Sequence, residues 1–357
     1  MTDVRSDEFA EPCHAKVNLV LEVRGKRADG YHELWTIFDE LELHDELLWI
    51  PTAKGPANPA SVSLVVRGGD TDARSVPADA SNLVCRAAAA FAAAYGKSVA
   101  GTFILTKNIP AGGGLGGGSS DAAAALRILA RQFGVPVNDS SLLTIACGVG
   151  ADVPFFLHGR RAWASGRGDE IHPIAAGPAL SYMLLFPGYA CSTANVFSRW
   201  HRELTHNKRE LDSSGLAARP RVENPTELLD HVLPTAVPEA PARGLYNDLA
   251  LPAMEACPAL GVLCARLREV GFVLHLSGSG STLFLAGTPG WIEEQGPVLE
   301  EVFTRLRSES FPGLGVGARL VRTRSRCGAP QAESVRDRGE EALGADQRDP
   351  SQAGGDV

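Results

Sequence analysis

Apolar residues along this chain follow two different periods. Short runs rich in branched side chains predict strands, and they lie at residues 15–23, 34–50, 102–106, 272–276 and 282–285. The run 34–50 alternates apolar residues with acids, and we expect one or two strands from it. Two further apolar stretches, 155–157 and 161–165, flank a tight His-Gly turn.

Alanine-rich segments predict the helices. Residues 81–95 have Ser81 or Asn82 as a cap, and residues 119–133 end at a glycine that is soon followed by a proline. Residues 138–147 predict a short helix, and residues 247–270 a helical stretch interrupted by two prolines. Strands and helices alternate without the regular order of a doubly wound parallel sheet. The pattern therefore predicts a mixed α+β protein in two halves.

Two segments lack this order. Residues 201–243 are dense in charge and proline, which indicates an irregular insertion or linker. Residues 328–357 carry seven acids, three arginines and almost no large apolar side chains. Such a segment cannot offset the entropy of ordering, and we expect a disordered acidic tail.

Composition narrows the class of protein. The 357 residues predict about two domains, and the net charge of -8 argues against a nucleic-acid partner. The polar, acidic N-terminus predicts no signal peptide, and no run of 18 apolar residues predicts a membrane span. The seven cysteines are scattered, without metal-binding spacing, as in a reduced cytoplasmic protein. We therefore expect a cytoplasmic protein without a membrane or nucleic-acid partner, and we assign no metal ligands.

The strongest candidate site is a glycine-rich loop. It runs Pro110-Ala111-Gly112-Gly113-Gly114-Leu115-Gly116-Gly117-Gly118-Ser119-Ser120, with six glycines in seven positions. Glycines let the backbone approach a ligand closely, and successive N–H groups can surround an anion. The helix predicted from Ser119 adds its N-terminal dipole, and the two serines add hydroxyl groups. The loop therefore predicts a phosphate site made of backbone.

Other interpretations of this loop stay open at this stage. Gly112, Gly114 and Gly117 fit the dinucleotide fingerprint, but the acid near the expected spacing, Asp139, does not end an evident second strand. A Walker loop is excluded, because no Gly-Lys-Ser/Thr follows. A merely flexible linker is disfavoured by the strand and the alanine-rich helix on either side.

Three motifs in order resemble those of the GHMP kinases, the family of galactokinase, homoserine kinase, mevalonate kinase and phosphomevalonate kinase. The glycine loop fits their second motif, Pro-x-x-x-Gly-Leu-Gly-x-x-Ser-Ser, at every position. Residues 12–21, with Lys16 and Asn18 on one face of a strand, resemble the first motif, except that His14 stands where the family has proline. Residues 276–284 resemble the third, a glycine-rich hairpin. Alone, Lys16 could be an edge lysine and the hairpin an ordinary turn.

The resemblance implies a fold and a site. It implies a ribosomal-protein-S5-like domain at 12–175 and a ferredoxin-like domain at 180–326, with nucleotide and substrate between them. It implies ATP with Mg²⁺, bound by the glycine loop and, less directly, by Asn82 and Lys107. For magnesium it suggests no protein ligand beyond Ser119 or Ser120. Asp152 matches the catalytic aspartate and Lys16 its partner, although Asp152 alone could be a helix cap.

Residues 27–33 and 150–155 resemble one branch of the family. Its substrate is a small molecule, a methylerythritol that carries a cytidine diphosphate group, on the non-mevalonate route to isoprenoid precursors. The resemblance implies that Tyr31 and His32 hold the cytosine, with Phe197 over its other face. An ordinary turn is the alternative for Tyr31 and His32. The further substrate-binding residues that we expect are Asn18, Thr193, Gly278 and Ser279.

Two other functions stay open. One is a GHMP kinase with a different alcohol substrate. The other is an inactive nucleotide-binding regulator, which the presence of Lys16, Asp152 and all three motifs disfavours.

Overall fold

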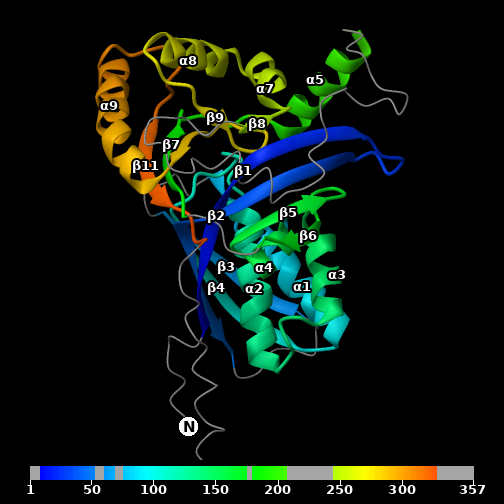
Figure 1. Ribbon diagram of the computed structural model, residues 1–357. Coiled ribbons are helices and arrows are strands. Elements are labelled where there is room, and N and C mark those ends of the chain that lie inside the picture. Colours follow the sequence, from blue (N-terminus) through cyan, green and yellow to red (C-terminus); the bar gives the residue numbers. More distant parts are fainter. Residues whose placement is uncertain (1–8, 53–59, 69–74, 175–178, 207–243, 328–357) are drawn as a thin grey trace, which may run out of the picture.

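The computed structural model describes residues 9–52, 60–68, 75–174, 179–206 and 244–327. Two separate sheets organise these residues (Figure 1). The strands of the first are β1 (Ala10–Lys26), β2 (His32–Pro51), β3 (Ala60–Gly68), β4 (Val99–Lys107), β5 (Arg161–Ser165), β6 (Glu170–Pro173) and β8 (Tyr246–Asn247). Their order is β3-β4-β2-β1-β8, with β5 paired to β2 and β6 to β5.

Helices cover one side of this sheet. They are α1 (Leu83–Tyr95), α2 (Gly117–Phe133), α3 (Ser140–Val149) and α4 (Val153–His158). The run Ala122–Ala125 in α2 is fully buried, and such small side chains allow the helix to lie close to its neighbours. The sequence predicted this helix from Ser119, but it begins at Gly117, with Gly116 at its N-cap in a left-handed conformation.

The second sheet has the order β11-β7-β10-β9. Its strands are β7 (Ser181–Phe186), β9 (His275–Leu276), β10 (Leu283–Gly287) and β11 (Arg319–Arg324), and its helices are α5 (Thr193–His206), α7 (Ala250–Ala256), α8 (Pro258–Glu269) and α9 (Pro289–Ser308). Its own apolar core includes Leu185, Leu263 and Leu283.

A buried polar network joins the two sheets. Asp39 of β2 accepts hydrogen bonds from Arg161 of β5 at 2.9 and 3.1 Å, from Ser325 at 2.8 Å, and from the hydroxyl of Tyr182 in β7. All four side chains are buried. Because a broken pair would leave a buried charge without a partner, this network holds the halves in a fixed relation.

Irregular pairing between β1 and β2 affects the direction of two polar side chains in β1. Its antiparallel register is interrupted between His14 and Lys16 and again between Asn18 and Val20. Bulges of this kind re-aim side chains and are frequent beside active sites. The interruptions flank Lys16 and Asn18, whose side chains are hydrogen-bonded to each other.

The sequence missed several elements, including β3, β7, β11, α5 and α9. The strand predicted at 272–276 is limited to β9, and residues 34–50 lie in a single strand. The predicted tail and residues 207–243 lie outside the described residues. The domain limits 12–175 and 180–326 remain a prediction, since β8 joins the first sheet. Among the described helices, none has the length and apolar character of a membrane span.

Candidate active site

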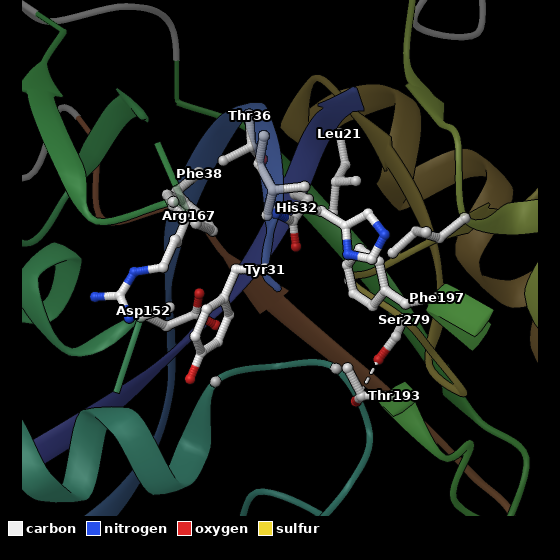
Figure 2. A pocket seen from close by; sticks show the side chains of 18 of the residues that line it. Leu21, Tyr31, His32, Thr36, Phe38, Asp152, Arg167, Thr193, Phe197 and Ser279 are labelled. Carbon is white, nitrogen blue, oxygen red and sulfur yellow. Dashed lines mark hydrogen bonds between the residues drawn. The ribbon is translucent and has the colours of Figure 1, made fainter. Parts of the chain in front are cut away.

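A cavity of about 560 Å³ brings most of the predicted site together (Figure 2). Its walls come from β1, β2, the glycine loop, the start of α4, the start of α5 and the loop before β10. The predicted site residues that line it are Lys16, Asn18, Tyr31, His32, Gly114, Gly116, Asp152, Thr193, Phe197, Gly278 and Ser279.

Lys16 and Asp152 form an ion pair at the inner end of the cavity. The Lys16 Nζ atom lies 3.7 Å from Asp152 Oδ2 and donates to Asn18 Oδ1 at 2.6 Å. Asn18 donates to the Thr36 hydroxyl at 2.7 Å, and Thr36 donates to the carbonyl of Val20 at 2.6 Å. Burial lowers the pKa of Lys16, and the charge of Asp152 opposes that shift. The ammonium group is thus held in one place, with its charge supported by a carboxylate.

The Asp152 carboxylate borders the cavity and does not cap the helix that it precedes. Asp152 occupies the N-cap position of α4, yet its side chain makes no capping hydrogen bond. About a third of that side chain is exposed, and it lines the cavity. A carboxylate held this way can accept a proton from a hydroxyl group placed in the cavity.

A second cavity, of about 510 Å³, follows the glycine loop from Pro110 to Ser119. Gly114, Gly116 and Thr193 line both cavities, so the two adjoin at the loop. The first N–H groups of α2 have no partner within the helix, and they begin at this junction. An anion in the second cavity would therefore meet backbone donors and the positive end of the helix dipole.

The third glycine motif supports the glycine loop directly. Ser277 donates its hydroxyl proton to the Gly114 carbonyl at 2.9 Å, and the Thr282 N–H donates to the Gly113 carbonyl at 3.1 Å. A Cβ on Gly114 would lie 2.2 Å from the Ser277 carbonyl oxygen. Close backbone contact between the two loops therefore requires glycine at that position.

Two residues predicted to contact ATP have side chains that interact elsewhere, and a third lines neither cavity. Asn82 caps α1 through Val84 N–H and donates to the Pro77 carbonyl. The Lys107 ammonium is buried between Asp121, at 2.8 Å, and Asp45. Ser120 is buried and lines neither cavity. Asn82 and Lys107 still border the second cavity, so their contact with a nucleotide stays a prediction.

Aromatic rings surround the outer end of the first cavity. His32 and Phe197 are stacked, with centroids 4.7 Å apart and an interplanar angle of 27°. Tyr31 stands on the opposite side, and Figure 2 shows open space between its ring and Phe197. Thr193 and Ser279 close the lower side through a hydroxyl–hydroxyl hydrogen bond of 2.8 Å. The open space between Tyr31 and Phe197 is thus bounded by an aromatic ring on either side.

The sequence analysis missed Thr36, Phe38, Arg167 and Asn247. Thr36, Phe38 and Arg167 line the cavity, and Asn247 holds the third motif by donating to the carbonyls of Leu276 and Gly278. Position alone could have flagged Thr36, which is a polar residue inside a predicted apolar strand. Nothing local distinguishes the other three.

Comparisons with known proteins agree with this geometry. Residues 82–160 match the model of the GHMP kinases N terminal domain. The chain is 35% identical over 273 residues to the 4-diphosphocytidyl-2-C-methyl-D-erythritol kinase of Alcanivorax borkumensis, covering 76% of this chain and 80% of that protein. It is 37% identical over 275 residues to the enzyme of the same name from Desulfotalea psychrophila, covering 76% and 82%.

A solved structure extends the match to the whole fold. The crystal structure of a 4-(cytidine 5'-diphospho)-2C-methyl-D-erythritol kinase superposes with a TM-score of 0.62 at 31% identity, over 88% of this chain and 98% of that one. This likeness confirms the predicted mixed α+β, two-domain architecture. The chain belongs to the GHMP kinase family, in the group of 4-diphosphocytidyl-2-C-methyl-D-erythritol kinases that these relatives represent.

Proposed function

We propose that this protein transfers the γ-phosphate of ATP to the 2-hydroxyl group of 4-diphosphocytidyl-2-C-methyl-D-erythritol. The products are the 2-phosphate and ADP, in the non-mevalonate pathway to isoprenoid precursors. One observation carries the proposal: the Lys16–Asp152 pair lines the cavity with the aromatic rings, and Lys16 lies next to Gly116, which also lines the glycine-loop cavity. The names of the relatives support the choice of substrate.

At the inner end, Asp152 is the general base. Its carboxylate takes the proton of the substrate hydroxyl as that oxygen forms a bond to the γ-phosphorus and the bond to the ADP oxygen breaks. Lys16 pairs with the Asp152 carboxylate and stabilises the negative charge that develops on the transferred group. Asn18 and Thr36 fix the ammonium group for both tasks.

The glycine loop and the start of α2 bind the triphosphate. Backbone N–H groups supply the donors, and Lys107 and Asn82 shape the neighbouring wall. The Ser119 hydroxyl, which borders the glycine-loop cavity, is an oxygen donor that suits Mg²⁺. A bound magnesium ion would supply neutralisation of the phosphate charge.

At the outer end, Tyr31, His32 and Phe197 bind the cytosine. Stacking on an aromatic side chain contributes about 1–3 kcal/mol per base. Thr193, Gly278 and Ser279 line the same cavity, and we expect them to contact the rest of the substrate. The proposed partner is thus a small molecule, and the net charge of -8 disfavours nucleic acid. We place the enzyme in the cytoplasm, consistent with seven free cysteines.

An ADP-release assay with 4-diphosphocytidyl-2-C-methyl-D-erythritol tests the proposal. Homoserine and mevalonate serve as competing alcohols, because a different GHMP kinase would prefer one of them. We expect release that depends on the cytidine substrate and saturates with it. ATP binding without phosphorylation of any alcohol would instead favour an inactive nucleotide-binding regulator.

A further inference from the structure

Tyr31 is an unusual residue for a binding wall because so little holds its ring. The residue is 55% exposed. Its backbone is fixed in a turn, where the Tyr31 N–H donates to Asp29 at 3.1 Å and its carbonyl accepts from the Arg27 N–H at 2.8 Å. Within the described residues the phenol hydroxyl makes no hydrogen bond. A ring this free must lose side-chain entropy when it stacks on a ligand.

Arg167 is the neighbour that limits this freedom. Its guanidinium carbon lies 5.0 Å from the centroid of the Tyr31 ring, within the range of a cation–π contact. Arg167 belongs to the turn between β5 and β6, in which Gly166 and Gly168 both have positive φ angles. This turn lies far from Tyr31 in the sequence, so the contact depends on the fold.

The guanidinium group is itself held firmly. Its Nε and Nη2 atoms donate to Asp169 at 2.9 and 2.6 Å, and Nη2 also donates to the Cys147 carbonyl at 3.2 Å. The hydrogen bonds to Asp169 raise the pKa of Arg167 above its ordinary value, so the group stays charged at any working pH. Its ring-facing surface is therefore a fixed cationic platform.

The order of the groups in space matters. Figure 2 shows the Tyr31 ring between the Arg167 guanidinium and the open part of the cavity that leads toward Phe197. Arg167 thus contacts one face of the ring and leaves the other face toward the cavity. A cation on the outer face would hold the ring in place for a base on the inner face.

We infer that Arg167 is a positioning residue that acts through Tyr31, so that guanidinium, phenol ring and cytosine form three successive layers. The inference rests on the proposed function, because it assigns the residue to recognition of the cytidine group. Arg167 then affects binding of the base and leaves the chemistry at Asp152 unchanged.

The test is a double-mutant cycle on Arg167→Gln and Tyr31→Ala, read by two probes. Cytidine carries the base alone, and CDP adds the diphosphate. When Tyr31 is present, Arg167→Gln should weaken the binding of cytidine and of CDP by the same factor, about 3- to 10-fold. It should raise the KM for the kinase substrate similarly, with kcat and the KM for ATP unchanged. In the Tyr31→Ala background it should have no further effect, since its target is gone.

Two control variants separate this role of Arg167 from a general loss of charge or of folding. Arg167→Lys keeps a charge beside the ring and should restore part of the affinity, and its melting temperature reports whether the turn is intact. Arg199→Gln removes another arginine that pairs with an acid, Glu255, but does not line the cavity. Arg199→Gln should leave the binding of cytidine and of CDP unchanged.

Four results would overturn the inference. Additive losses in the cycle would mean that Arg167 does not act through Tyr31. Weaker CDP binding with unchanged cytidine binding would make Arg167 a contact for the diphosphate. The wild-type enzyme could phosphorylate the cytidine substrate while Arg167→Gln shows the same probe affinities, KM values and kcat. That result would contradict the inference and leave the proposed function intact. A wild-type protein that neither binds cytidine nor phosphorylates its derivative would remove both.

Discussion

The two ends of the central cavity are built in contrasting ways. At the inner end, Lys16 is only 3% exposed and belongs to a chain of hydrogen bonds that ends on backbone. At the outer end, Tyr31 is 55% exposed and its ring is held by one cation–π contact. A preorganised inner end stabilises the transition state, whereas exposed rings stabilise bound substrate and transition state alike. Changes at the inner end should therefore lower kcat, and changes at the outer end should raise KM.

The largest effect is expected from the catalytic pair. Asp152→Asn removes the base and Lys16→Met removes the charge, and each should lower kcat by about 10²–10⁴-fold. Because the two groups act as a unit, the double variant should lose far less than the product of the single losses. Substrate affinity, measured by titration with a nonreactive ATP analogue present, should survive Asp152→Asn. Multiplicative losses would show that the two residues act independently.

The second largest effect is expected from alanine substitution at one of two comparable glycines, which lie at the two ends of α2. Gly116 and Gly134 have φ angles of 71° and 69°, so alanine strains both similarly. A Cβ on Gly116 would lie 2.8 Å from Phe156 and 3.1 Å from Lys16 Cγ, whereas one on Gly134 meets nothing within 4 Å. We expect Gly116→Ala to lower kcat/KM for ATP by about tenfold or more, because a 1 Å misplacement can cost 10²-fold.

Gly134→Ala is the control for the backbone. Both variants should lose a similar amount of stability in a denaturant titration, and only Gly116→Ala should lose activity. Equal activity in the two variants would mean that the glycine loop tolerates a side chain beside Lys16.

Substitutions at the outer end should change the KM for the cytidine substrate. Tyr31→Ala removes one stacking surface, worth about 1–3 kcal/mol, so the KM for the cytidine substrate should rise by about 5- to 150-fold. Steady-state kinetics should show kcat within about twofold of wild type. A kcat loss as large as that of Asp152→Asn would erase the distinction between the two ends.

The smallest effect concerns stability alone, from histidines near each end. Burial lowers the pKa of His14, which lies in the same strand as Lys16, to about 3, and it lowers the pKa of His275, just before the third motif, to about 4. These groups are neutral when folded but gain a proton near pH 6.5 when unfolded, so their stabilisation is present above pH 6.5 and is lost as the pH falls toward 4. His275→Asn should flatten the pH dependence of unfolding by up to about 3 kcal/mol across that window. Urea titrations at several pH values give the free energy of unfolding across this window. The same pH dependence in His275→Asn as in the wild type would contradict this assignment.

The sequence was informative where the backbone itself forms the site. The glycine loop, Lys16, Asp152 and the aromatic residues are brought together as expected, because their motifs are local and the family resemblance ordered them. It was less informative where contacts span the fold. Lys107 pairs with Asp45, 62 residues away, and Arg167 reaches Tyr31 from another turn. No local period or motif encodes such pairs, and strands such as β7 and β11 were missed because they are defined by pairing with each other.

The central claim is that Asp152 takes the proton of a cytidine-linked alcohol. The most direct measurement is ADP release from wild-type enzyme and Asp152→Asn at saturating ATP, with 4-diphosphocytidyl-2-C-methyl-D-erythritol varied. The account predicts substrate-dependent turnover in the wild type and a kcat lower by about 10²–10⁴-fold in the variant, at nearly the same KM. Near-wild-type kcat in Asp152→Asn would contradict it, and the reaction would then rest on positioning by Lys16 and the glycine loop alone.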